Sequence, residues 1–134
     1  MTISKQNKQD FIAGYLEAAL WSSTDTHPKT GDDVRLDDYE WGEGVEESLK
    51  DDCLDFIQGN KARLQAYCTK ISYDPSKGTP WDSAGHDFWL TRNGHGAGFW
   101  DRGLGGLGDH LTEAAKVYGG VDLYLGDDEL IYEV

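Results

Sequence analysis

Apolar residues follow the period of an α-helix in two segments of the first half of the chain. Residues 4 to 21 place them at positions i, i+1, i+4 and i+5 and onward, after Ser4, whose hydroxyl suits a helix N-cap. Residues 48 to 68 carry a second helical stripe, which is weakened at Gly59 because glycine has a low helix propensity. The pattern predicts two amphipathic helices, the first followed by a turn-rich loop over residues 22 to 33.

The middle of the chain predicts a loop followed by a β-hairpin. Two prolines and several turn-forming residues indicate the loop over residues 72 to 85. The segments HDFWLT and GAGFWDR then flank Asn93-Gly94, the dipeptide best suited to a two-residue hairpin turn because both central positions need positive φ. In this register aromatic side chains pair across the strands, so we expect the hairpin to be central in the domain.

The last thirty residues predict a short helix and a second hairpin. Asp109 follows a glycine-rich stretch and can cap a helix that ends at Gly119-Gly120. The segments VDLYL and ELIYEV alternate on either side of a GDD turn. The expected fold class is therefore α+β, with two N-terminal helices followed by a ββαββ unit that forms a small, mainly antiparallel sheet, in a single domain spanning residues 1–134.

The charge of the chain restricts the classes of partner. Its 134 residues include 25 acidic and 12 basic side chains, for a formal net charge of −13. Proteins bind a phosphate backbone through cationic side chains that release counterions, so we do not expect direct binding of nucleic acid. A charge of this sign and size attracts basic surfaces instead. We therefore expect a partner protein with a basic, nucleic-acid-binding surface.

Residues 32 to 55 hold most of this charge. Eleven acidic residues stand there against Arg35 and Lys50, a net charge of −9. Interleaved aromatic residues such as Tyr39 and Trp41 argue against a disordered tail, because a solvated linker has no need of them. We expect an ordered segment that displays its carboxylates. Together with the tip of the first hairpin, the expected partner-binding residues are Asp32, Asp33, Asp37, Asp38, Glu40, Glu43, Glu46, Glu47, Asp51, Asp52, Arg92, Asn93 and His95.

Candidate catalytic residues gather in the predicted first hairpin. In its register His86 lies opposite Asp101, next to Asp87, and such a His-Asp pair can orient a general base or help to hold a metal ion. His95 would lie at the other end of the hairpin, roughly 25 Å away at the rise of a strand, so the two histidines cannot share an ion. The sequence has no HExxH or GxSxG motif and no zinc-ligand spacing. We therefore expect neither a metal nor a cofactor, and catalysis by His86, Asp87 and Asp101, with His110 as a further candidate, is an alternative only.

The cysteines and the N-terminus indicate a cellular compartment. Cys53 and Cys68 lie fifteen positions apart in the predicted second helix, roughly 22 Å if that helix is continuous, which is beyond disulfide reach. Reduced thiols are typical of cytosolic proteins. The first ten residues have no apolar signal core, and no run of the chain approaches the length of a membrane span. We expect a cytoplasmic protein that does not contact a membrane.

Three stretches of the sequence together resemble a known group of proteins. FIAGYLEAALWSSTD, AGHDFWLTRNGHGAGFWDRG and DLYLGDDELIY are similar to segments of a family of small acidic proteins encoded by bacteriophages and other mobile elements. The resemblance implies a phage or plasmid context, with the host cytoplasm as the site of action. It supplies no activity, substrate or catalytic residue.

Three hypotheses of function follow, and they belong to different classes. The first is a non-enzymatic phage or plasmid accessory protein that binds and inhibits a host nucleic-acid-handling protein, of the anti-restriction or anti-CRISPR type, with surface carboxylates standing in for phosphates. The second is a small metal-dependent or nucleic-acid-processing enzyme that uses His86 and Asp101. The third is a structural or replication-associated phage protein, in which the acidic segment only confers solubility.

Overall fold

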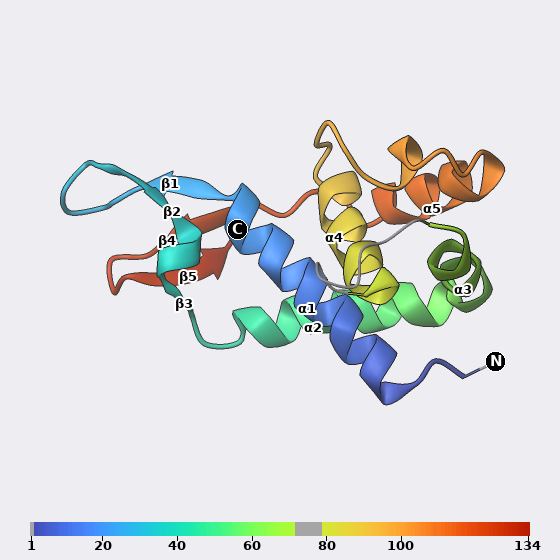
Figure 1. The fold of residues 1–134 in the computed structure, drawn as a ribbon. Helices are drawn as coiled ribbons and strands as arrows, with labels where there is room; N and C mark the ends of the chain where they lie inside the picture. Colours follow the sequence, from blue (N-terminus) through green and yellow to red (C-terminus); the bar gives the residue numbers. More distant parts are fainter. Residues whose placement is uncertain (1, 72–78) are drawn as a thin grey trace.

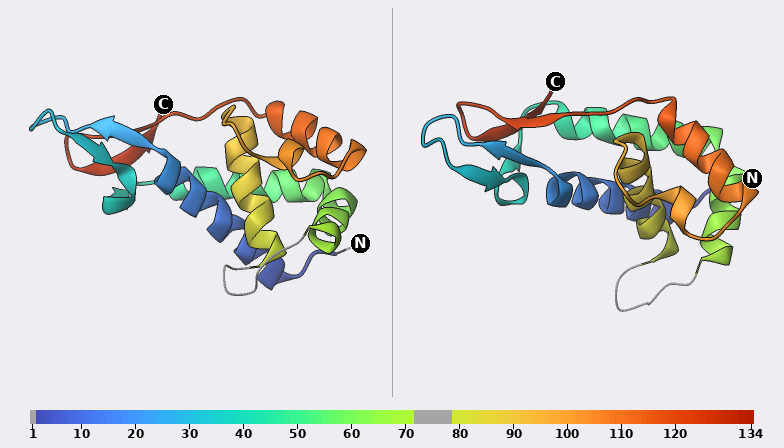
Figure 2. Two further views of the ribbon diagram at one scale, coloured as in Figure 1. Left: turned by 45° about the horizontal axis from the view of Figure 1, so that its top comes forward. Right: turned by 90° about the horizontal axis from the view of Figure 1, so that it is seen from above.

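The helices and the strands of the protein occupy different ends of the molecule (Figure 1). The computed structural model describes residues 2–71 and 79–134. Within these residues the turned views agree that both sheets lie at one end, while α3, α5 and the N-terminus lie at the other (Figure 2). In chain order the elements are α1 (Lys5–Ser22), β1 (Thr24–Thr26), β2 (Asp33–Arg35), the 3-10 helix η1 (Leu36–Asp38), β3 (Glu40–Trp41), α2 (Val45–Gly59), α3 (Lys61–Lys70), α4 (Pro80–Arg92), the 3-10 helix η3 (Phe99–Asp101), α5 (Gly106–Lys116), β4 (Leu123–Leu125) and β5 (Leu130–Glu133).

Two glycines let α1 and α4 cross in direct main-chain contact. Ser4 caps α1 by accepting a hydrogen bond from the Asn7 amide at 3.1 Å, as the sequence predicts. A Cβ at Gly14 would overlap the carbonyl oxygen of Asp82, and a Cβ at Gly85 would overlap the carbonyl oxygen of Phe11. Any larger residue at either position would force the helices apart, so the crossing depends on both glycines.

An aromatic cluster fills the space among α1, α2 and α4. The Phe56 and Phe88 rings stack with their centroids 4.1 Å apart and their planes 15° apart, and Phe99 lies 5.9 Å from Phe56 on nearly parallel planes. Tyr15 of α1 meets the edge of Trp89 at 5.4 Å. All five side chains are fully or almost fully buried, and such pairs contribute about 0.5–1.5 kcal/mol each beyond the burial of their area.

The strands form two small sheets, and the Asp25 side chain is one of their connections. β1 and β2 pair antiparallel, and the second sheet has the order β3-β5-β4, with β3 parallel and β4 antiparallel to β5. Leu125 and Ile131 are register partners and turn their side chains into the core. The Leu125 amide donates to Oδ2 of Asp25 at 2.8 Å, which ties β4 to β1. The predicted second hairpin is confirmed, because β4 and β5 are its strands.

The predicted first hairpin is wrong, and with it the ββαββ unit. Residues 80–92 form α4, which begins with Thr79 as N-cap and Pro80 in its first turn. Phe88 and Trp89 are both buried because α4 is covered on more than one side, and an apolar run that is buried all round does not distinguish a helix from a strand. Asn93-Gly94 ends the helix, with Gly94 at φ 70°, and makes no hairpin turn.

Other sequence predictions are confirmed or corrected at the level of single elements. The first helix is confirmed as α1, but the predicted helix over residues 48 to 68 is two helices, α2 and α3, separated at Asn60. The predicted loop over 72 to 85 overlaps α4 from Pro80 onward, and its residues 72–78 lie outside the described part of the chain. Cys53 and Cys68 are free thiols, on α2 and α3 respectively.

Candidate functional site: an acidic end built from two chain segments

Most of the negative charge of the molecule gathers where the strands lie. Residues 24–43 and 121–134, named the acidic end here, contain both sheets and hold twelve acidic side chains against Lys29 and Arg35. Their formal charge is −10 of the total −13, although they make up only 34 of the 134 residues. The two segments lie far apart in the sequence and side by side in space (Figures 1 and 2).

Main-chain pairing brings the two segments together. Glu40 and Leu130 are register partners in the parallel pair of β3 and β5, and the Gly42 amide donates to the Ile131 carbonyl at 2.7 Å. A Cβ at Gly42 would overlap the Tyr132 ring, so this close approach requires glycine. Glu40 and Glu133 are therefore carried on paired backbone, which fixes their relative placement.

His27 fastens the loop between β1 and β2 to the turn between β4 and β5. Its buried ring accepts hydrogen bonds at Nδ1 from the amides of Lys29 and Thr30, at 3.1 and 3.3 Å. Because Nδ1 accepts, the ring proton is on Nε2, which donates to Oε1 of Glu129 at 2.8 Å. One histidine thus connects segments 102 positions apart in the chain.

Four carboxylates of the acidic end serve the fold. Asp25 accepts from the Leu125 amide, Glu129 accepts from His27, and Asp37 pairs with Arg35 at 2.8 Å. Asp128 accepts from the Tyr132 hydroxyl and from the Leu130 amide, and these hydrogen bonds lower the pKa of its carboxyl group. These four groups hold the sheets and their turns in place.

The other eight carboxylates of the acidic end are not engaged in this way. Within residues 2–71 and 79–134 none of them makes a side-chain hydrogen bond or ion pair, and seven of the eight belong to exposed residues. Unpaired like charges on one surface raise the local negative potential, which a salt-bridged surface would not do. The eight residues are Asp32, Asp33, Asp38, Glu40, Glu43, Asp122, Asp127 and Glu133.

The acidic residues predicted on α2 have mixed roles. Glu46 and Glu47 lie 4.0 Å from the Lys50 ammonium, which partly offsets their charge, and Asp51 is exposed. Asp52 is instead a structural partner, because its Oδ2 accepts from Arg92 at 2.8 Å. The predicted acidic segment is therefore divided between the acidic end and the helical part of the molecule.

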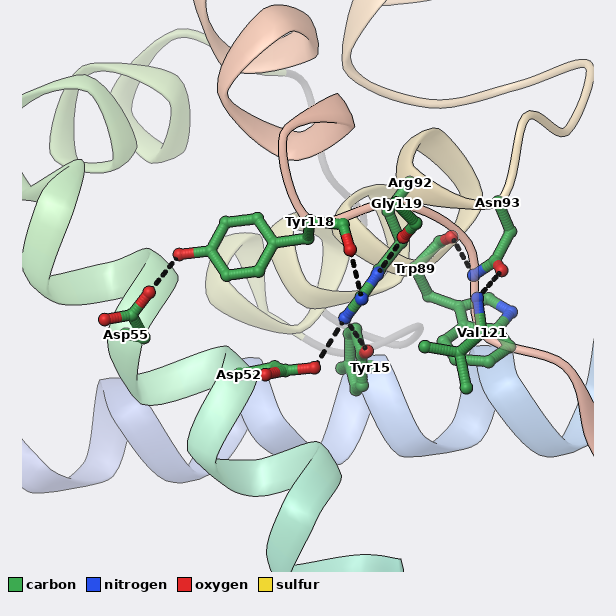
Figure 3. Close-up of polar contacts among 9 residues, drawn as sticks. All are labelled: Tyr15, Asp52, Asp55, Trp89, Arg92, Asn93, Tyr118, Gly119 and Val121. Carbon is green, nitrogen blue, oxygen red and sulfur yellow. Dashed lines mark hydrogen bonds and ion pairs between the residues drawn. The ribbon is translucent and has the colours of Figure 1, made fainter. Parts of the chain in front are cut away.

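Arg92 lies inside the protein and not at an exposed hairpin tip. Figure 3 shows its guanidinium between α1, α2 and the chain that follows α5. Nε and Nη2 donate to the carbonyls of Gly119 and Tyr118 at 2.8 and 3.1 Å, and Nη1 donates to the Tyr15 hydroxyl at 3.0 Å and to Asp52. The predicted role of Arg92 in partner binding therefore has no support in its position.

Asn93 is likewise occupied, whereas His95 is exposed. The Asn93 amide group donates to the Trp89 carbonyl at 2.9 Å and accepts from the Val121 amide at 2.7 Å, as Figure 3 shows. His95 follows in the turn after α4 and lies open to solvent. Of the three residues assigned to the tip, only His95 presents its side chain at the surface.

The residues of the catalytic alternative do not form the expected pair. Asp87 is 2% exposed and accepts from the Tyr67 hydroxyl at 2.5 Å and twice from Arg102, at 2.9 and 3.1 Å. Asp101 accepts from the Gly98 amide, and His86 lies beside Trp21 with 6.0 Å between ring centroids. Within the described residues, His86 and Asp101 therefore make no hydrogen bond or ion pair with each other.

No metal site accompanies these residues in the part of the chain that the structure describes. There, no three His, Cys, Asp or Glu side chains converge in a way that would hold a metal ion. His110 is exposed on α5. Among the same residues, no helix combines the length and apolar character that a bilayer crossing requires.

Sequence reasoning missed the C-terminal half of the acidic end. The last thirteen residues contain five acidic side chains and no basic one, but the GDD within them predicts first of all a turn. The signal is this local charge, whose meaning depends on the pairing of β5 with β3.

Comparisons of the chain with protein-family models, with curated proteins and with solved structures find no match.

Proposed function

We propose that this protein binds another protein through the acidic end and blocks a basic surface that the partner uses for nucleic acid. The observation that carries the proposal is a formal charge of −10 within 34 residues. Eight of the carboxylates there form no side-chain hydrogen bond or ion pair within the described residues. Such a surface attracts a cleft of positive potential, which accelerates encounter and selects against acidic partners.

The rigid display of the carboxylates supports this function over mere solubility. A charge that only keeps a protein in solution needs no fixed arrangement. Three of these groups, on Asp33, Glu40 and Glu133, stand on paired strands and the others lie close beside strands, while His27 and Asp25 fasten the two segments together. The Tyr124 ring lies beside the Tyr132 ring with 5.8 Å between centroids, and Tyr124 is 41% exposed, so aromatic surface lies among the charges. Tyrosine is enriched in the buried centre of protein interfaces.

The setting of the proposal comes from the sequence resemblance. In a phage or plasmid context, the partner would be a host restriction or CRISPR effector, and the protein would act in the host cytoplasm as its inhibitor. A nucleic-acid-processing activity of His86, Asp87 and Asp101 is not carried forward, because Asp87 is buried under Arg102 and Asp101 holds a turn.

Affinity capture with charge-matched variants tests the proposal. The immobilised full chain is exposed to bacterial lysate, and the wild type is compared with the double variant Asp38→Asn/Asp127→Asn, whose sites are exposed and come one from each segment. The matched control is Asp109→Asn/Glu113→Gln on α5, at the helical end. A third variant, Glu47→Gln/Asp51→Asn, reports whether the α2 face extends the surface.

The proposal expects a basic nucleic-acid-binding protein to be retained by the wild type and the α5 control. The Asp38 and Asp127 variant should retain it about ten-fold less tightly, since two lost charge contacts are worth about 1.4 kcal/mol together. Retention should also fall as salt rises from 50 to 300 mM, because the contacts are exposed charges. Equal retention by both double variants, or retention independent of salt, would favour a structural or merely solubilising role.

A further inference from the structure

A second surface feature lies outside the acidic end, in the groove between α1 and α4. A cavity of about 260 Å³ opens there to solvent. It is lined by Glu17, Asp82, Ser83, His86 and Arg102. Neither the acidic end nor the core explains why titratable side chains of both signs gather at this place.

The helix crossing sets the geometry of the cavity. Glu17 and Trp21 stand one turn apart on α1, and Asp82 and His86 stand one turn apart on α4, so both pairs follow the i, i+4 spacing of one helix face. The approach of Asp82 to α1 is close because Gly14 lies beneath it. The cavity therefore lies beside the close main-chain contact of α1 and α4.

The charge balance within the cavity favours a cation. The guanidinium of Arg102 is already neutralised by Asp87, which is buried and receives two hydrogen bonds from it. Glu17 and Asp82 remain, and neither has an ion-pair partner in the described residues. Partial burial and the neighbouring Glu17 raise the pKa of Asp82. The raised pKa means that the charged form of this carboxyl group is disfavoured in free energy at this place.

Trp21 supplies the aromatic face that cation recognition uses. The side chain is 58% exposed, although tryptophan at the end of a packed helix is usually covered. Its ring lies 6.0 Å from the ring of His86, which lines the cavity. An exposed indole attracts a cation through the negative face of its π-system.

We propose that this cavity binds a guanidinium group. A guanidinium is planar and stacks on an indole, and its fork of donors matches carboxylates, whereas an ammonium group is a strongly hydrated point charge. The volume suits one side chain or one small molecule. The same chemistry is offered by an arginine side chain of a protein and by free arginine or a related small guanidine, and the experiment distinguishes these sources.

The test uses the five tryptophan indole N–H signals of the ¹⁵N-labelled full chain, with Trp21→Phe identifying the signal of Trp21. The probes are N-acetyl-arginine-methylamide, free arginine, the neutral isostere N-acetyl-citrulline-methylamide and MgCl₂. The proposal expects the arginine probe to shift the Trp21 signal with saturation. Citrulline, which keeps the shape without the charge, should bind at least ten-fold more weakly, and Mg²⁺ should not compete.

Two single variants separate binding from folding. Glu17→Gln should weaken the arginine probe about ten-fold while leaving the other indole signals in place, and Glu113→Gln on α5 should change nothing. Tighter binding of the blocked probe than of free arginine identifies a protein side chain as the source, because the blocked probe carries the flanking amide groups of a peptide chain in place of the free α-ammonium and carboxylate groups. Tighter binding of free arginine identifies a small molecule.

Equal shifts with citrulline, displacement by Mg²⁺, or unchanged affinity in the Glu17 variant would overturn the proposal. The experiment contains no macromolecular partner. Its failure would therefore leave the proposed role of the acidic end untouched, and its success would not depend on that role.

Discussion

Arg92 joins four parts of the chain through one guanidinium group. It belongs to α4, donates to α1 through Tyr15 and to α2 through Asp52, and holds two carbonyls of the segment after α5. Its carbon Cζ also lies over the rings of Phe88 and Tyr118, at 5.6 and 5.5 Å. The hydrogen bonds of a buried cation with this many partners offset the free-energy cost of its desolvation. Removal of the cation leaves its buried partners without hydrogen bonds, which costs much free energy.

Replacement of Arg92 by methionine should lower the free energy of unfolding by about 3–5 kcal/mol, since it leaves carbonyls and a carboxylate without their donor. Arg35→Met is the matched control, because Arg35 pairs with Asp37 at the surface, where a pair contributes less than about 1 kcal/mol. Urea unfolding followed by tryptophan fluorescence measures both. Similar losses for the two variants would show that the Arg92 contacts carry no special weight.

Asp82 is a residue whose charge opposes folding. Because burial and Glu17 raise the pKa of Asp82 above its unfolded value, the folded state prefers the protonated form, and stability declines as the pH rises through that pKa. Asp82→Asn should therefore be more stable than the wild type at pH 7. The difference should shrink as the pH falls toward the ordinary aspartate value, about 3.9.

Thermal unfolding of the Asp82→Asn variant and the wild type at pH 7, 5.5 and 4.5 measures this effect. Such a gain in stability, combined with loss of guanidinium binding, would show that Asp82 is retained for a ligand at some cost to the fold. A variant that is less stable than the wild type at pH 7 would show that the carboxylate mainly stabilises the first turn of α4.

At the scale of elements, the crossing of α1 and α4 is the contact around which the other elements pack. It places Trp89 against Tyr15 and forms one wall of the guanidinium cavity. The crossing lacks side chains at Gly14 and Gly85, so neither helix can accept a methyl group there. Sequence periodicity reveals an apolar face but does not reveal which glycines allow such close contact.

Gly14→Ala and Gly85→Ala should each destabilise the protein by about 3 kcal/mol or more, because the added methyl group meets main-chain atoms that cannot move aside. Gly59→Ala is the control, since Gly59 ends α2 with open space around the position of a Cβ. That change should be neutral or stabilising by up to about 1 kcal/mol, because alanine is the better helix former. Chemical denaturation compares the three, and equal effects would contradict the described crossing.

Elements with one buried face could be predicted from the sequence, and elements buried on several faces could not. The sequence shows the helical period in the apolar stripes of α1 and α5, and it shows the strand period in the alternation of β4 and β5. The period is visible because residues of the opposite face are polar. In α4 the buried residues run almost without interruption from Asp87 to Arg92, so the period is lost. The aromatic residues and the Asn93-Gly94 pair then favoured a hairpin, although Thr79 and Pro80 were available as a helix start.

At the scale of the whole molecule, the charge is distributed along its length. The acidic end has a formal charge of −10, while the remaining 100 residues together have −3. The acidic residues from 32 to 43 could be predicted as part of a surface from the sequence. The C-terminal ones could not, because they reach the same place only through long-range contacts: the parallel pairing of β3 with β5 and the hydrogen bonds of Asp25 and His27. No local pattern predicts a pairing across about ninety residues of chain.

Displacement of proteins from immobilised DNA tests the central claim most directly. Bacterial lysate is bound to DNA-cellulose and eluted with the wild type, with Asp38→Asn/Asp127→Asn, or with the charge-matched α5 control Asp109→Asn/Glu113→Gln. If the acidic end occupies a nucleic-acid-binding surface, the wild type and the α5 control release the same protein at similar concentrations, and the Asp38 and Asp127 variant requires about ten-fold more. Release of no protein by the wild type, or equal release by all three forms, would contradict the account.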